Sequence, residues 1–212
     1  MANLLRRLTL LTCVILLAAT ACAAPSTPTP PPAPTAAPIP GFRLFEGSGV
    51  ALQLPESYDG GKANSDDFKL VLERVKSLGS DFENIAKALE ANPDLYLLWA
   101  FDSKVGPSGF LTNVNVTSEQ VISAIGVETY AEAVRKQLPA QIEIQAQDDL
   151  TVAGQPAIRL ISVMEQFNAQ QSMYMLKRGN RIYIVTYSTG IDEFEPRLKQ
   201  FEQSIQTFTV TP

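Results

Sequence analysis

Apolar and polar residues alternate in several short stretches of this chain, which is the pattern of half-buried β-strands. In residues 50–54, for example, valine and leucine alternate with Ala51 and Gln53. The predicted strands cover residues 44–46, 50–54, 95–101, 110–116, 142–146, 157–167, 172–176 and 181–188. Turns are predicted between them at residues 59–61, 102–109, 148–149, 154–156 and 179–180. The last turn, Gly179-Asn180, is typical of a hairpin tip.

Four other stretches repeat apolar residues at spacings of three and four, the pattern of an amphipathic helix. The predicted helices cover residues 68–78, 80–91, 126–138 and 194–208. The apolar stripe of the last helix consists of Phe194, Leu198, Phe201, Ile205 and Phe208. Pro196 is expected in its first turn, where a missing N–H costs little. Ser80 and Glu83 form a capping-box pattern at the start of the second helix.

Strands and helices are grouped along the chain and do not alternate strictly. This order predicts an α+β fold with a mostly antiparallel sheet, and it argues against a doubly wound nucleotide-binding fold. The first 40 or so residues look non-globular, which leaves about 170 residues, enough for one domain with a hydrophobic core. We therefore expect a single domain over residues 42–212.

The first 21 residues have the pattern of an export signal. Arg6 and Arg7 precede an apolar stretch, residues 8–19. As a helix this stretch would span about 18 Å, well short of the ~30 Å hydrocarbon core of a bilayer. The segment is therefore interpreted as a signal peptide and not as a permanent membrane span.

Cys22 follows this signal in the sequence Ala19-Thr20-Ala21-Cys22, which resembles the lipobox of bacterial lipoproteins. The lipobox prefers leucine where this chain has Ala19. We predict that Cys22 is the lipid-modified N-terminus of a protein held on the extracytoplasmic face of the cell membrane. The alternative is cleavage by ordinary signal peptidase, for which Ala19-Thr20-Ala21 also serves, with Cys22 incidental.

Residues 22–41 are rich in proline, threonine and alanine. Proline removes backbone donors and fixes φ, so this segment is predicted to be an extended spacer with no helix or sheet. Eighteen such residues reach up to roughly 55 Å. The alternative is a recognition peptide for a proline-binding module.

Charge and missing residue types restrict the function. The chain has 17 basic and 22 acidic residues. Removal of Arg6 and Arg7 with the signal leaves 15 against 22, a net charge of −7. This sign argues against nucleic acid as a partner and against direct attraction to anionic lipids. The chain has no histidine, and its two cysteines, Cys13 and Cys22, precede the domain. Ser-His and Cys-His catalysis, thiolate zinc sites and disulfides are thereby excluded from the domain.

Several candidate sites have simpler structural interpretations. Ser108 lies between glycines, but a nucleophile elbow needs a different spacing and a histidine, so a loop is favoured. Four oxygen donors, Asp59, Asn64, Asp66 and Asp67, do not match an EF-hand loop, and no metal site or cofactor is predicted. Aromatic residues that could line a ligand cleft are interpreted as core residues; they are Trp99, Tyr174, Tyr183 and Tyr187. The same holds for the methionines that could form an adaptable binding surface, Met164, Met173 and Met175.

Three segments together resemble the PsbP-like superfamily, which includes LpqN-type bacterial lipoproteins. They are residues 50–55 (VALQLP), residues 151–157 (TVAGQPA) and the closing helix with Ser204 and Phe208. The resemblance covers about residues 42–210. It implies an α/β/α sandwich around a central antiparallel sheet and a non-enzymatic module that binds or helps to assemble other proteins. It supplies no ligand-binding residues.

The sequence therefore predicts a lipid-anchored, non-enzymatic module with a protein partner in the cell envelope. Two alternatives remain open at this point: a carrier of a small hydrophobic ligand, and a cell-wall hydrolase that uses carboxylates alone.

Overall fold

The computed structural model describes residues 36–211 except residues 64, 78 and 79. The predicted signal peptide (residues 1–21), Cys22 and most of the spacer lie outside the described residues. So do Asn64 and the side chains of Asp67 and Ser80, on which the acidic cluster and the capping box depend.

The described part of the chain is built on a seven-stranded sheet in which every neighbouring pair is antiparallel. Its strand order is β3 (Tyr58–Gly61), β4 (Leu98–Asp102), β5 (Asn113–Gln120), β9 (Arg181–Gly190), β8 (Ala169–Arg178), β7 (Gln155–Met164) and β6 (Glu143–Val152). A smaller antiparallel sheet consists of β1 (Phe42–Glu46), β2 (Val50–Pro55) and β10 (Thr209–Val210).

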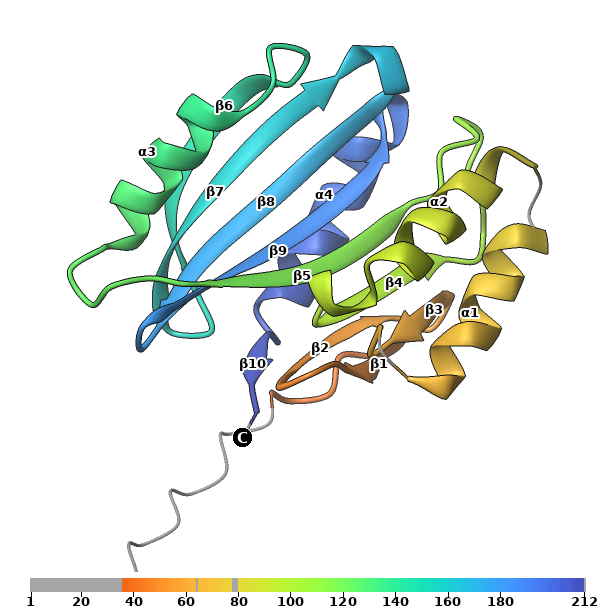
Figure 1. Cartoon of the computed structure of the whole chain (residues 1–212), viewed down its shortest axis with the longest axis horizontal. Coiled ribbons are helices and arrows are strands. Elements are labelled where there is room, and N and C mark those ends of the chain that lie inside the picture. Colours follow the sequence, from red (N-terminus) through yellow and green to blue (C-terminus); the bar gives the residue numbers. More distant parts are fainter. Residues whose placement is uncertain (1–35, 64, 78–79, 212) are drawn as a thin grey trace, which may run out of the picture. The chain divides into compact units, whose positions relative to one another are not determined.

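Helices cover both faces of the large sheet. They are α1 (Asp66–Ser77), α2 (Ser80–Ala91), α3 (Val127–Gln137) and α4 (Ile191–Ile205), with short 3-10 turns η1 (Pro93–Leu95) and η2 (Glu165–Phe167). Figure 1 shows α1, α2 and α3 on the near face of the sheet, with α4 behind it. The predicted α+β fold with layered helices is therefore confirmed.

Three apolar clusters hold these layers together. The largest lies between the sheet, the small sheet and α4, and it includes Leu52, Tyr187 and Phe201. The second packs α1 and α2 on Trp99 and Phe101 of β4, and the third packs α3 on β7, β8 and β9. Leu98 and Ala100 belong to the first cluster, so β4 is apolar on both faces. This explains why its sequence is nearly continuous in apolar residues.

Two predicted turns are strands in the structure. The turn predicted at residues 59–61 is β3, which pairs with β4, because Gly60 lets the two backbones approach closely. A Cβ atom on Gly60 would lie 2.3 Å from the carbonyl oxygen of Trp99. The turn predicted at Asp148-Asp149 lies in the middle of β6, where an edge strand keeps both side chains near solvent.

Other predictions shift by a few residues. The strand predicted from residue 95 begins at Leu98, because the preceding residues form η1. The last helix begins at Ile191, so Pro196 lies inside α4 and not in its first turn. Proline there leaves the carbonyl group four residues earlier without its helical donor. Strand β10 was not predicted, because two residues carry no periodicity.

Candidate functional site

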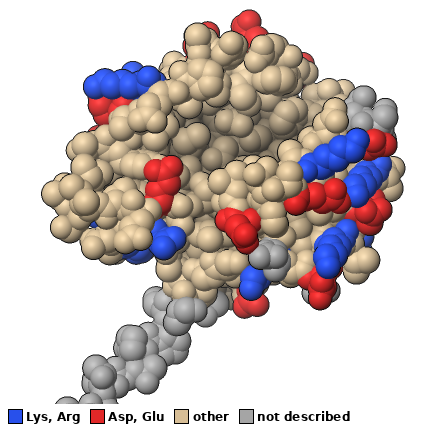
Figure 2. Space-filling model, in the orientation of Figure 1, with Lys and Arg blue, Asp and Glu red and all other residues tan. Residues whose placement is uncertain are grey.

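The middle of the large sheet is left uncovered between α2 and α3. Figure 2 shows the space-filling surface hollowed there, with no Lys, Arg, Asp or Glu visible in the hollow. The strand register identifies the floor of this hollow, because Asn115 lies opposite both Trp99 and Thr186, and Thr186 lies opposite Met173. Opposed residues share a face. The open floor consists of Asn113, Asn115, Thr117, Gln171, Met173, Ile184, Thr186 and Ser188.

Every side chain of the open floor is uncharged. Most are half-buried, as expected for the bottom of a concave surface. Gln171 donates a hydrogen bond to Ser188 (Nε2–Oγ 3.0 Å), and Asn113 donates to the carbonyl of Leu111 (2.9 Å). These bonds orient the amide groups and leave other amide donors and acceptors accessible. The floor is therefore a polar surface in which the half-buried side chains of Met173 and Ile184 pack against the cluster under α3.

An apolar pocket of about 370 Å³ lies beyond the Asn113 and Gln171 end of the floor. Its lining consists of Phe82, Ile85, Ser108, Gly109, Phe110, Leu111, Phe167 and Asn168. Phe167, on η2, is 62% exposed, although large apolar side chains are usually buried. The turn behind it is fixed, because Asn168 adopts a left-handed conformation with φ of 48° and donates from its backbone N–H to Glu165. The phenylalanine is thus presented to solvent by ordered backbone.

A buried ionic network holds the loop that forms one wall of this pocket. The Ser108 side chain and backbone N–H both donate to the carboxylate of Glu193 in α4. Arg197 donates to Glu193 (Nε–Oε2 3.2 Å) and to Asp102 (Nη1–Oδ2 2.8 Å). A Cβ atom on Gly106 would lie 2.1 Å from the Glu193 carboxylate, so glycine is needed there for close approach. Ser108 therefore fixes a loop, as the sequence predicted.

Hydrogen bonding decides the ionisation of Glu193. Burial raises its pKa, but the hydrogen bonds from Ser108 and the positive charge of Arg197 outweigh burial, so the pKa lies below its usual value. A carboxylate that is ionised and saturated with donors lacks the proton that a general acid needs. The hydrogen bonds of this network tie the loop of Ser108 to α4.

A second cavity, of about 460 Å³, lies between α4 and strands β6 to β8. Arg159 spans it, donating to Asp148 (Nη2–Oδ2 2.8 Å) and to Glu202 (Nη1–Oε1 2.8 Å). The Tyr174 hydroxyl is buried with no hydrogen-bond partner among the described residues. Burial raises the pKa of Tyr174, and the nearby charge of Arg159 opposes this rise. Both carboxylates are engaged by one guanidinium, so these contacts join β6, β7 and α4.

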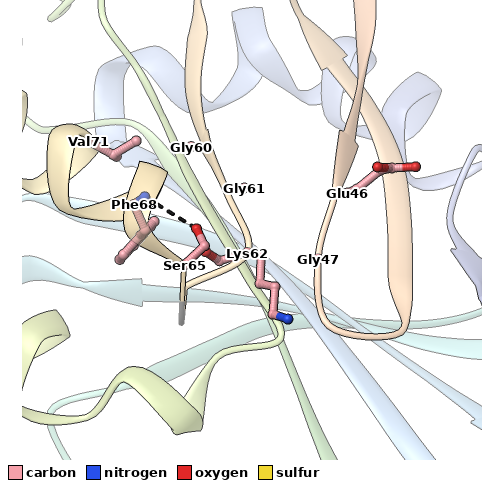
Figure 3. Close-up of a pocket in the computed structure, with 8 residues that line it drawn as sticks. All are labelled: Glu46, Gly47, Gly60, Gly61, Lys62, Ser65, Phe68 and Val71. Atoms are coloured by element: carbon pink, nitrogen blue, oxygen red, sulfur yellow. Dashed lines mark hydrogen bonds between the residues drawn. The ribbon is translucent and has the colours of Figure 1, made fainter.

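A third cavity, of about 340 Å³, lies between β3, α1 and the end of β1 (Figure 3). Glycines make much of its wall: Gly47, Gly60 and Gly61. A Cβ atom on Gly61 would lie 3.5 Å from the carbonyl oxygen of Glu46, which is an ordinary van der Waals contact. The Ser65 hydroxyl in this cavity is already used, because it accepts a hydrogen bond from the Phe68 N–H at the start of α1.

The structure separates the candidate residues named from the sequence. The aromatics interpreted as core residues are buried; Trp99, Tyr174, Tyr183 and Tyr187 are at most 8% exposed. Met175 is buried too, whereas Met173 is half-buried on the open floor and packs against the cluster under α3. Among the described residues, no three acidic, histidine or cysteine side chains are grouped as metal ligands. Asp59 instead pairs with Arg74 (2.9 Å).

Sequence reasoning did not find the open floor. Asn113 and Asn115 fall in the predicted strand 110–116 with no face assigned to them, and Gln171 falls in no predicted strand. The sequence feature that could have indicated the floor is the set of uncharged polar residues in these strands, because outward faces of strands usually carry charged residues. Only the register of three strands brings these residues together.

Comparisons with known proteins give structural likenesses only. No family model matches the chain, and no curated protein sequence does. Cyanobacterial PsbP from Synechocystis sp. PCC 6803 is 13% identical, with 82% of this chain and 94% of that chain covered and a TM-score of 0.49. LpqN of Mycobacterium tuberculosis, involved in cell envelope biogenesis, is 11% identical, with 81% and 91% covered and a TM-score of 0.49.

A third solved structure is a protein of unknown function, PA94 from Pseudomonas aeruginosa. It is 14% identical, with 81% of this chain and 98% of that chain covered and a TM-score of 0.44. At these identities the likeness to the three solved structures concerns the fold alone. A search for membrane-spanning helices among the described residues finds none of sufficient length and hydrophobicity.

Proposed function

We propose that this chain is a membrane-anchored extracytoplasmic lipoprotein that works without catalysis, by binding another protein of the cell envelope through the open floor and the adjoining apolar pocket. The observation that carries the proposal is the uncharged hollow between α2 and α3. The rest of the visible face carries many charges, along α1 and α2 above all. Lack of charge at the centre of a surface is the compositional mark of protein interfaces.

The chemistry of the hollow defines the partner segment. The amides of Asn113, Asn115 and Gln171 suit the backbone and uncharged polar side chains of an extended or looped segment. The exposed ring of Phe167 suits an apolar side chain seated in the pocket. A charged segment would have to give up its hydration without an opposite charge to replace it. We therefore assign an uncharged protein segment with one apolar anchor as the occupant.

Site-specific photocrosslinking of the full anchored chain in its native membrane tests this assignment. A benzoylphenylalanine residue placed at Phe167 or Met173 is expected to give a discrete adduct with one protein. The same probe at Leu70 is the matched control, because Leu70 is equally exposed (63%) but lies on α1. Equal adducts from Leu70 would contradict the proposal, and an adduct with a lipid would favour a small-ligand carrier.

A substitution makes the crosslinking result specific. Met173→Lys puts an unpaired charge on the open floor, and we expect the adduct from position 167 to fall by roughly tenfold or more, as for loss of an interface hot spot. Leu70→Lys adds the same charge outside the hollow and should leave the adduct unchanged. An adduct insensitive to Met173→Lys would exclude the floor as the binding surface.

A further inference from the structure

Strand β6 forms one edge of the seven-stranded sheet, since among the strands that the structure describes β7 alone pairs with it. Nine of its ten residues, Glu143 to Thr151, are exposed or half-buried, and Val152 alone is buried. The neighbouring strand β7 has five buried residues in the same length. The edge is therefore long and exposed, with side-chain contacts from Gln206 at Thr151 and from Arg135 at Gln147. It is separate from the open floor, which uses β5, β8 and β9.

The backbone groups that point outward from β6 follow from its hairpin with β7. Val152 and Gln155 flank a two-residue loop, so Val152, Leu150 and Asp148 share hydrogen bonds with β7. The N–H and C=O groups of Gln147, Asp149 and Thr151 then point away from the sheet. The carbonyl of Thr151 fits this assignment, because it accepts a hydrogen bond from Gln206 (2.8 Å).

The charged residues of strand β6 itself are all of one sign, although Arg135 of α3 donates to Gln147 beside them (Nη1–Oε1 3.1 Å). Strand β6 carries Glu143, Asp148 and Asp149 and no basic residue. Asp148 is neutralised by Arg159, whereas among the described residues Glu143 and Asp149 make no ion pair. In a register that opposes Asp148 or Asp149 to the acids of a second copy of β6, acid would face acid, which destabilises cross-strand pairs. A basic strand would instead place lysine or arginine opposite these acids.

From the free backbone groups and the single sign of charge, we propose that β6 accepts an extended, basic segment of a partner protein as an eighth strand. Backbone hydrogen bonds to Gln147 and Asp149 supply the docking, as in other strand additions. The acidic residues of β6, lying opposite lysine or arginine of the partner, give the preference for a basic segment. Acidic side chains and the irregularity between Ile144 and Ala146 are also ways to keep an edge from aggregating. A purely protective edge would reject basic and acidic strands alike.

Peptide binding to the full chain in neutral detergent micelles distinguishes these roles. The probe is a capped, fluorescent heptapeptide that alternates lysine and valine, and glutamate replaces lysine in the comparison peptide. We expect the lysine peptide to bind and the glutamate peptide to bind at least roughly tenfold more weakly. Methylation of alternate backbone amides along one edge of the lysine peptide should weaken its binding by a further factor of roughly ten, because methylation removes backbone donors without changing side chains.

Two pairs of variants locate the binding. Asp149→Pro removes an outward N–H without breaking the ladder to β7, and it should weaken binding roughly tenfold. Leu44→Pro is its control, because the matching N–H of Leu44 points outward from the small sheet. Asp149→Lys should weaken peptide binding as well. Glu195→Lys makes the same change of charge at an exposed residue of α4 and should leave peptide binding unchanged. Hydrogen exchange should show protection of the Gln147 and Asp149 amides in the complex.

The opposite results would overturn the proposal. Equal binding of the lysine, glutamate and methylated peptides would show that neither charge nor backbone is recognised at β6. Failure of the lysine peptide to protect the Asp149 amide would mean that the edge is only protective. Dimerisation through β6 in sedimentation would identify a second copy as the occupant. Met173→Lys should leave peptide binding intact, so failure of this proposal does not affect the role of the open floor.

Discussion

Arg197 illustrates how one side chain can stabilise a whole loop. Its side chain is 18% exposed and lies between two carboxylates, Asp102 and Glu193, that are less exposed still. Arg197→Met would leave both charges without their cation in a poorly hydrated place. We expect the free energy of unfolding to fall by about 3–5 kcal/mol, measured by urea denaturation. Lys69→Met, at an exposed pair with Asp66, is the control and should change stability by less than about 1 kcal/mol.

The depressed pKa of Glu193 makes the same network sensitive to acid. A carboxyl group whose pKa is lower in the folded state stabilises the fold at every pH above its unfolded value, here 4.5. This stabilisation is lost as the pH falls from 4.5 through the folded pKa. Urea denaturation should be measured from pH 7 to pH 3. At neutral pH the free energy of unfolding of the wild type should lie well above that of Glu193→Gln. The difference between the two should shrink below pH 4.5. A constant difference would mean that Glu193 acts by shape and not by charge.

Among the elements, α4 depends most on a single apolar stripe. Phe201 is 1% exposed, stacks on Tyr187 with ring centroids 4.9 Å apart, and contacts Phe194 edge-on. Phe201→Ala leaves a cavity between the helix and the sheet, and we expect it to reduce the free energy of unfolding by about 3–5 kcal/mol. Leu70→Ala, on the exposed side of α1, should cost less than about 0.5 kcal/mol. Equal costs in thermal denaturation would show that α4 packs loosely.

How far the sequence predicted each element depends on how much local pattern the element carries. Helix α4 was predicted because of its apolar stripe, of which four residues lie in the helix and Phe208 lies beyond its end at Ile205. The β8–β9 hairpin was predicted because Gly179-Asn180 marks its tip. Strand β3 was missed because Gly60 and Gly61 usually signal turns, and their pairing depends on contact with Trp99, far along the chain. The open floor was missed for the same kind of reason, since it exists only where three strands meet in register.

At the scale of the whole molecule, the predicted anchor at Cys22 determines where the two proposed surfaces work. Each methylene group of an acyl chain buried in a bilayer contributes about 0.8 kcal/mol, so two or three chains on one cysteine hold a protein firmly. Without the predicted signal the chain would carry a net charge of −7, a sign that argues against electrostatic attraction to anionic lipids in place of acyl chains. Membrane attachment of this chain should therefore depend on one thiol.

Cys22→Ser tests this dependence directly. We expect the variant to leave the membrane fraction and to incorporate no labelled fatty acid. Cys13→Ser, inside the predicted signal, is the matched control, and it should stay on the membrane and incorporate the fatty acid. Retention of Cys22→Ser on the membrane would exclude lipidation as the anchor. It would also remove the reason for a long proline-rich spacer, because a spacer of up to roughly 55 Å serves to carry a domain away from the surface to which its first residue is fixed.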